Sequence, residues 1–132
     1  MILGDGEYNM ARYEEALKTF AQARTLFEAA GDPTGVANSI VRMGNIYRER
    51  GDFEQAEQSY REAEDIFREN GIDSGIVNCM RALADMYKRQ RKIDQAKKQY
   101  GATLQYCRET KQSQAEANCL LALGDLYADA KE

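Results

Sequence analysis

The sequence Met43-Gly44-Asn45-Ile46-Tyr47 returns twice along the chain, as Leu-Ala-Asp-Met-Tyr at residues 83–87 and as Leu-Gly-Asp-Leu-Tyr at residues 123–127. The small residue and the tyrosine keep a spacing of 40 residues in all three copies. Three further columns follow the same step: Ala16, Ala56 and Ala96; Phe20, Tyr60 and Tyr100; Asn38, Asn78 and Asn118. A fixed period of this length predicts a repeat architecture, in which each unit buries its apolar face against its neighbours.

Each 40-residue unit is expected to contain two helices, because stop signals lie inside the period as well as between periods. Glycines, which adopt the left-handed conformation of helix ends without steric cost, stand at these points: Gly31, Gly51 and Gly71. Asp32 followed by Pro33 is typical of a helix start, and Asp52 with Gln55 resembles a capping box. The pattern predicts about seven helices, near residues 2–10, 12–30, 33–50, 52–70, 73–90, 92–110 and 113–130.

The composition favours an all-α fold. The chain has 132 residues, a single proline and 43% hydrophobic residues, and Ala, Glu, Gln, Arg and Leu, which lose little rotamer freedom in a helix, recur throughout. The apolar fraction is sufficient for one continuous core. We therefore expect one domain over residues 1–132, a fragment of a longer solenoid. It would hold three and a half repeats, at residues 1–31, 32–71, 72–111 and 112–132.

The charge balance argues against several classes of partner. The formal net charge is −4 and the pI is about 5.0, whereas nucleic-acid binding needs a clustered basic surface. No apolar run approaches the roughly 18 residues of a membrane span, and the first residues do not resemble a signal peptide. The three cysteines lack a metal-ligand spacing, which favours buried thiols in a reducing compartment. We expect a cytoplasmic protein that contacts neither nucleic acid nor membrane.

The repeated motif resembles the tetratricopeptide repeat, whose signature is Leu-Gly-x-x-Tyr in one helix and Ala-x-x-x-Phe in its partner. Matches to the signature start at six positions, three for each half: Met43, Leu83 and Leu123, then Ala16, Ala56 and Ala96. The resemblance covers essentially the whole chain. It implies a right-handed α-solenoid of antiparallel helix hairpins, in which the first helix of each hairpin lines a concave groove.

The chain departs from the tetratricopeptide pattern in two respects. Its step is 40 residues, whereas the family's usual step is about 34. The tryptophan that opens the signature is replaced by Ile40, Met80 and Leu120. The longer step is similar to the extended repeats of kinesin light chain and of spindle-orientation adaptors, with each helix about one turn longer.

Nothing in the sequence favours an enzyme. The chain has no histidine, which removes the commonest general base and the commonest nitrogen ligand for metals. It also lacks a phosphate-binding loop of the G-x-x-x-x-G-K-[ST] type. Asp85 and Asp125 share one repeat column, but successive hairpins would hold them about 10 Å apart on an open surface. We therefore expect no catalytic residues, no metal site and no cofactor.

The free face of each first helix is the candidate peptide-binding surface. Asn38 and Asn45 point the same way, since seven residues complete nearly two helical turns, and by resemblance this face lines the groove. The predicted groove residues are Asn38, Arg42, Asn45, Asn78, Arg81, Asp85, Lys88, Arg89, Asn118, Leu121 and Asp125. The Asn ladder, residues 38, 78 and 118, offers a donor and an acceptor at each step to the peptide groups of an extended ligand. Alternatively, the ladder fixes the geometry between neighbouring helices.

A basic cluster lies where the helices near 73–90 and 92–110 are expected to meet. Its members are Lys88, Arg89, Arg91, Lys92, Lys97 and Lys98. Such a cluster would attract an acidic peptide. The alternative is a solvated hairpin tip with no partner, since exposed charge runs are usually only surface.

The last helix repeats the pattern that elsewhere receives a partner helix, but no partner follows it in this sequence. The residues concerned are Leu120, Gly124 and Tyr127. Either Leu120 and Tyr127 turn inward against the helix near 92–110, or a second copy of the chain covers them. The second alternative predicts a symmetric homodimer, because a self-complementary apolar patch gives a closed two-fold contact.

Together these patterns predict a protein–protein interaction scaffold that binds a peptide segment of a partner in its concave groove. The competing hypothesis is a self-association or spacer segment of a larger signalling or regulatory protein, whose groove has no ligand. The two differ in one observable. Only the scaffold predicts that substitutions in the groove alter a ligand interaction while thermal stability stays nearly constant.

Overall fold

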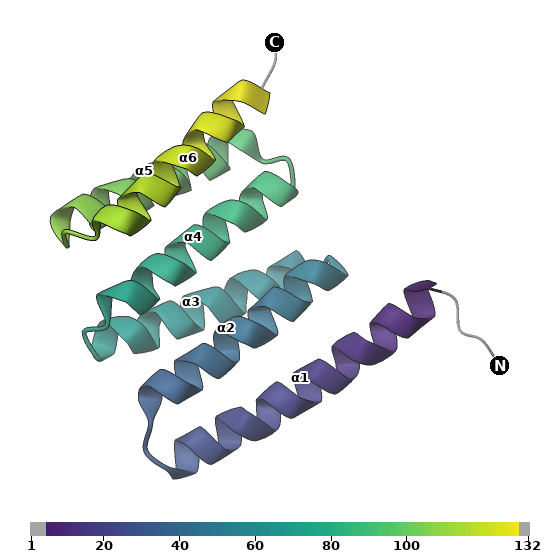
Figure 1. Cartoon of the computed structure of the whole chain (residues 1–132). Coiled ribbons are helices and arrows are strands. Elements are labelled where there is room, and N and C mark those ends of the chain that lie inside the picture. The colour runs from purple at the N-terminus through teal and green to yellow at the C-terminus, as the bar shows by residue number, and fades with distance from the viewer. Residues whose placement is uncertain (1–4, 130–132) are drawn as a thin grey trace. The chain divides into compact units, whose positions relative to one another are not determined.

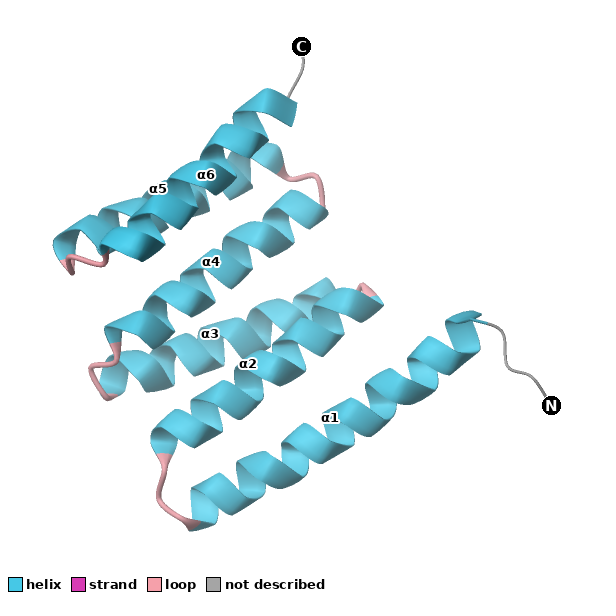
Figure 2. Cartoon of the chain, viewed as in Figure 1, coloured by secondary structure: helices cyan, strands magenta, loops and turns pink. Residues whose placement is uncertain are grey.

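The computed structural model describes residues 5–129, and all secondary structure in this part of the chain is α-helical (Figure 2). Six helices follow one another along the chain (Figure 1): α1 Asp5–Ala29, α2 Pro33–Arg50, α3 Phe53–Glu69, α4 Asp73–Arg89, α5 Ile93–Glu109 and α6 Ser113–Asp129. The main contacts join sequence neighbours, α1 with α2, α2 with α3, α4 with α5, and α5 with α6. The expected all-α fold of helix hairpins is confirmed.

The chain divides into two compact units, unit 1 at residues 1–70 and unit 2 at residues 71–132. Unit 1 contains α1, α2 and α3, and unit 2 contains α4, α5 and α6. The division falls within one residue of the predicted boundary between the repeats 32–71 and 72–111. The single domain over residues 1–132 and the hand of the solenoid stay predictions.

The turns between helices share one backbone conformation. Residues with positive φ recur every 20 positions, at Gly31, Gly51, Gly71, Arg91 and Lys111. After α2, the Gly51 N–H donates to the Arg48 carbonyl at 3.0 Å and the Asp52 N–H donates to the Tyr47 carbonyl at 2.8 Å. These two bonds satisfy carbonyls that have no partner inside the helix. The glycine stops are thus confirmed, and Arg91 and Lys111 hold the same conformation without glycine.

The break expected near residue 11 is wrong, because α1 runs unbroken from Asp5 to Ala29. The 20-residue step would put a left-handed residue at Ala11. Alanine is the strongest helix former, and a left-handed conformation would cost it about 1–2 kcal/mol. The described residues therefore form six helices instead of about seven, and the first predicted repeat contributes only one. Residues 2–4 and 130 of the expected helices lie outside the described residues.

The helices α2 and α3 begin differently. The Asp32 carboxylate caps α2 by accepting from the Gly35 N–H at 3.1 Å, and Pro33 occupies the first turn. This start agrees with the sequence. The Asp52 side chain makes no capping hydrogen bond to α3, so the expected capping box is wrong there. Asp52 pairs instead with Arg50, whose Nε lies 3.2 Å from Asp52 Oδ2.

A tyrosine of the second helix lies at the centre of each hairpin. In unit 1, Tyr60 is fully buried, and a Cβ added to Gly44 would lie only 2.9 Å from Tyr60 Cε1. In unit 2, Tyr100 is buried in the same way, as are Ala84 and Ala96. The small residues therefore permit the close helix approach that their spacing predicts.

Candidate peptide-binding groove

An open hollow of about 400 Å³ lies between α4 and α6 in unit 2. Three predicted groove residues line it, namely Asn78, Arg81 and Asn118. Two of these, Asn78 and Asn118, belong to successive first helices and are exposed, while Arg81 is half-buried. The structure thus brings together, in one unit, two steps of the Asn ladder and one guanidinium.

The rest of the lining is mostly polar and was missed by the sequence analysis. It consists of Ser74, Val77, Gln112, Ser113, Gln114 and Ala115. A signal for Ser74 and Gln114 was present, because each precedes a ladder asparagine by four residues, which is about one helical turn. The hollow therefore extends the predicted face one turn toward the N-termini of α4 and α6.

Two predicted groove residues are engaged inside the hairpins. Asn45 Oδ1 accepts a hydrogen bond of 2.6 Å from the Tyr60 hydroxyl, and Asp85 Oδ1 accepts one from the Tyr100 hydroxyl. Both pairs span 15 residues, so the interaction repeats with the 40-residue step. Burial, reinforced by the hydrogen bond to Asp85, raises the pKa of Tyr100. The hydroxyl therefore remains a donor throughout the neutral range.

The remaining predicted groove residues lie outside the hollow. Asn38 and Arg42 are exposed on α2 in unit 1. In unit 2, Lys88 and Arg89 occupy the last turn of α4, where cations interact favourably with the helix dipole. Leu121 and Asp125 are exposed on α6.

The basic cluster is only partly free surface. Arg91 adopts the positive-φ conformation of the α4–α5 turn, and Lys92 precedes α5. Lys97 Nζ lies 5.0 Å from the centre of the Tyr127 ring, a cation–π distance. One member of the cluster thus holds an aromatic side chain of α6.

The three cysteines are buried, as expected, and none of them forms a disulfide. Burial, together with the nearby Cys107, raises the pKa of the Cys119 thiol to about 11. Burial also raises the pKa of Cys107. Cys119 Sγ donates to the Tyr100 carbonyl at 3.1 Å. The Cys107 and Cys119 thiols therefore stay protonated at neutral pH and are poor nucleophiles.

Residues 5–129 offer neither a metal site nor a membrane-spanning helix. No group of three or more histidine, cysteine or acidic side chains is arranged to hold a metal ion. None of the described helices is both long and apolar enough to pass through a bilayer.

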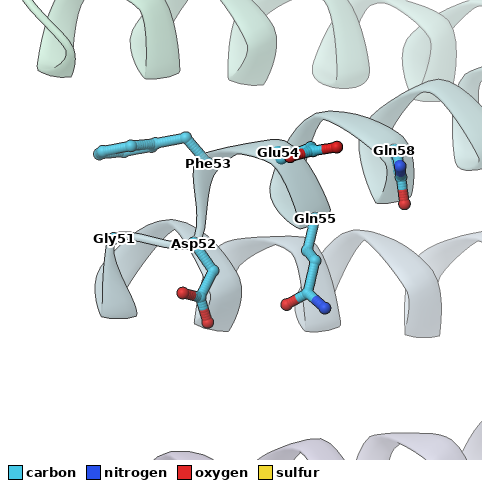
Figure 3. A pocket seen from close by; sticks show the side chains of 6 residues that line it. All are labelled: Gly51, Asp52, Phe53, Glu54, Gln55 and Gln58. Carbon is cyan, nitrogen blue, oxygen red and sulfur yellow. The ribbon is translucent and has the colours of Figure 1, made fainter.

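A larger hollow, of about 640 Å³, lies at the α2–α3 turn (Figure 3). Gly51, Asp52 and Phe53 line it together with Glu54, Gln55 and Gln58. All six residues come from one short stretch, so the hollow is a surface around the start of α3 and not a cleft between elements. Figure 3 shows the Phe53 ring pointing away from the Asp52 and Gln55 side chains. The hollow at the α2–α3 turn is therefore not a candidate functional site.

The outer face of α6 is uncovered within the described residues. Leu120 is 46% exposed and Tyr127 is 60% exposed, whereas the buried residues of the helix are Cys119 and Leu126. Apart from its chain neighbours and the nearby backbone of α6, no described heavy atom lies within 4 Å of the position that a Cβ on Gly124 would take. Leu120 and Tyr127 are thus largely exposed, although the Tyr127 ring also lies beneath Lys97 of α5, and both alternatives for this helix stay predictions.

Comparison with known families supports the repeat. Residues 2–69 match the family model of the tetratricopeptide repeat. The match covers more than half of the 132 residues. No curated protein gives a significant match to the chain.

Proposed function

The chain belongs to the tetratricopeptide repeat family, and from this we propose that it is a scaffold that holds an extended peptide segment of a partner protein against α4 and α6. The family suggests a role in protein–protein interaction and is typically non-enzymatic. The observation that carries the finer proposal is the hollow lined by Asn78, Arg81 and Asn118.

The chemistry of the hollow suits an extended backbone. Each asparagine side chain offers both a donor and an acceptor, so Asn78 and Asn118 together match successive peptide groups without requiring particular side chains. The Arg81 guanidinium adds a fork of donors that favours a carboxylate of the ligand. The lining carries no acidic side chain, so an acidic ligand meets no repulsion from the hollow itself.

The basic cluster supports an acidic ligand as well. Lys88 and Arg89 lie on α4, the helix that also carries Asn78 and Arg81. Attraction between such a cluster and a carboxylate-rich peptide would weaken as salt shortens the Debye length to about 8–10 Å. An affinity that does not change with salt concentration would show that the basic cluster does not contact the ligand.

Affinity capture of partners, followed by peptide mapping, tests the groove. The native chain should retain a partner that the Arg81→Glu chain loses, because charge reversal repels the ligand carboxylate. Lys18→Glu is the matched control, since Lys18 is an exposed residue of α1 in unit 1. A mapped peptide that binds equally to the native chain and to the Asn78→Ala/Asn118→Ala chain would make the Asn ladder structural and reject the groove.

A second candidate function is self-association, which the exposed Leu120, Leu121 and Tyr127 of α6 favour. In that case the chain forms a homodimer through α6, or acts as a spacer whose groove stays empty. Light scattering over a concentration series, comparing the native chain with Leu120→Glu/Tyr127→Glu, tests it. A native chain that remains monomeric at high concentration rejects the homodimer.

We also propose a cytoplasmic location without nucleic-acid or membrane contacts. Three cysteines without a disulfide suit a reducing compartment. The pI of about 5.0 is unlike that of a typical nucleic-acid-binding domain, whose surface is basic overall.

A further inference from the structure

The guanidinium of Arg81 is unpaired, although an acidic side chain stands one helical turn away. Arg81 is half-buried on α4 and lines the hollow between α4 and α6. Asp85 follows it by four residues, the spacing at which opposite charges on a helix attract one another. Within residues 5–129, however, neither a hydrogen bond nor an ion pair engages the Arg81 guanidinium. The ion pair that the spacing favours is therefore missing from α4.

Other pairs with this spacing do form in the same chain. Two such pairs on α3 each have a nitrogen–oxygen distance of 2.9 Å. On α1, Arg24 and Glu28 have the same order of charges as Arg81 and Asp85, and Arg24 Nε lies 3.6 Å from Glu28 Oε2. Spacing and order of charges therefore do not explain why Arg81 and Asp85 stay unpaired.

The Asp85 carboxylate is engaged by a side chain of α5. Its Oδ1 accepts a hydrogen bond from the hydroxyl of Tyr100, whose side chain is almost fully buried. Burial and this hydrogen bond raise the pKa of Tyr100, while the charge of Arg81 acts in the opposite sense. The guanidinium thus lies near the Tyr100–Asp85 pair without joining it.

The equivalent hairpin in unit 1 lacks both charges. Val41 and Asn45 stand at the repeat positions of Arg81 and Asp85. The Tyr60 hydroxyl donates to Asn45 Oδ1 at 2.6 Å, so the hydrogen bond across a hairpin does not require a carboxylate. Of these two hairpins, only the one in unit 2 has an acceptor that could also pair with a cation of the groove.

From these observations we propose that Tyr100 is a positioning residue for the groove. Its hydroxyl holds the Asp85 carboxylate toward α5, so that the Arg81 guanidinium stays unpaired at the hollow and binds a carboxylate of the ligand. Tyr100 does not line the hollow and acts only through Asp85. This inference rests on the proposed binding of an acidic peptide, and it explains how the site keeps a cation available beside an acidic side chain.

Loss of the Tyr100 hydroxyl should release Asp85 to pair with Arg81. A partly exposed ion pair is weaker than a hydrogen bond to a charged group, so the new pair would replace the lost interaction only in part. A ligand carboxylate would then have to displace Asp85 from the guanidinium. This competition should weaken ligand binding about fivefold.

Fluorescence anisotropy with a fluorescein-labelled hexaglutamate peptide tests the proposal. The Tyr100→Phe chain should bind this peptide about fivefold more weakly than the native chain. The chain with both Tyr100→Phe and Asp85→Asn should regain the native affinity, because asparagine forms no ion pair with Arg81. Tyr60→Phe is the matched control, since it removes the equivalent hydroxyl in unit 1 and should leave the affinity unchanged.

The recovery of binding separates positioning from damage to the hairpin. If Tyr100→Phe acted only by loosening α5 from α4, adding Asp85→Asn would not restore the affinity. That result would overturn the proposal, and so would an unchanged affinity of the Tyr100→Phe chain with native circular dichroism.

A second variant tests the same claim with the tyrosine in place. Asp85→Asn should keep the hydrogen bond from Tyr100, as Asn45 keeps the one from Tyr60 in unit 1. It should bind the peptide at most about twofold more tightly than the native chain, because Asp85 does not occupy Arg81. A gain of fivefold or more would show that Asp85 competes with the ligand despite Tyr100, and would reject the positioning role.

Failure of the proposed function gives a different result. If the hexaglutamate peptide bound the Arg81→Gln chain as tightly as the native chain, Arg81 would not belong to the binding site. The free chain still tests the positioning by nuclear magnetic resonance. A nuclear Overhauser effect between Arg81 Hε and Asp85 Hβ should be absent from the native chain and present after Tyr100→Phe. Its absence after Tyr100→Phe would overturn the inference whatever the peptide does.

Discussion

The hairpins α2–α3 and α4–α5 share one packing scheme but realise it with different side chains. In unit 1, Tyr60 lies against Gly44 and donates to an amide. In unit 2, Tyr100 donates to a carboxylate, and the buried Ala84 stands at the repeat position of Gly44. The turns differ as well, with Gly51 in the first hairpin and Arg91 in the second. The comparison teaches that the repeat preserves the size of a side chain and the position of an acceptor, while the chemical group itself varies.

The largest difference should appear at the small residue. Gly44→Leu should lower the free energy of unfolding by about 3 kcal/mol, because the new side chain overlaps the buried Tyr60 ring and overpacks the hairpin. Gly124→Leu is the control, since its position is empty and leucine gains up to about 1 kcal/mol of helix propensity over glycine. Urea unfolding followed by circular dichroism measures both. Equal effects of the two substitutions would show that α3 does not require a glycine at position 44.

Alkaline pH should weaken unit 2 through Cys119. Its pKa rises from 9.0 in the unfolded chain to about 11 in the fold, so the folded state holds a proton that the unfolded state releases. The stabilisation is complete below pH 9 and falls by about 2 kcal/mol as the pH approaches 11. Unfolding measured from pH 8 to pH 11 should show a shallower decline for Cys119→Ala. An unchanged slope would mean that the thiol does not contribute.

The tyrosine hydroxyls should contribute differently to the stability of the two hairpins. Tyr100→Phe should cost about 2 kcal/mol because it leaves the Asp85 carboxylate without its donor, whereas Tyr60→Phe removes a neutral hydrogen bond worth about 1 kcal/mol. Thermal unfolding of both variants measures the difference. If Asp85→Asn in the Tyr100→Phe background restored no stability, the orphaned carboxylate would not be the cause.

The smallest effects are expected at the turns. Arg91→Gly should raise the free energy of unfolding by about 0.5 kcal/mol, since glycine tolerates the left-handed conformation but gains entropy when unfolded. Gly51→Ala should lower the free energy of unfolding by about 1 kcal/mol, because alanine pays a steric cost in the left-handed conformation. Urea midpoints are sensitive enough to detect both. A gain from Gly51→Ala would show that this turn does not need its positive φ.

Much of the fold follows from the sequence because its signals are local. Glycines at 20-residue intervals and apolar residues in helical phase specify the ends and the inner faces of most helices. The exception at Ala11 is also local, since neither glycine nor proline stands there to end a helix. Arg91 and Lys111 end helices without any distinctive residue, so only their place in the period marks them.

The candidate site was less predictable, because helical phase gives a direction but not a contact. Phase alone placed Asn78, Arg81 and Asn118 on one face, and the structure joins them around one hollow. The same phase placed Asn45 and Asp85 on that face. Each instead accepts a hydrogen bond from a tyrosine hydroxyl of the next helix, 15 residues later in the sequence. Helical phase describes only one helix and therefore does not predict such a contact.

The 20-residue spacing of the left-handed turns has a consequence for how such a chain can change in length. A single residue inserted within a helix rotates everything after it by about 100°, which would carry tyrosines such as Tyr60 away from their acceptors. An insertion of 40 residues between two equivalent turns adds a complete hairpin and leaves every later side chain in phase. The architecture therefore tolerates changes in length best when whole hairpins are duplicated or deleted.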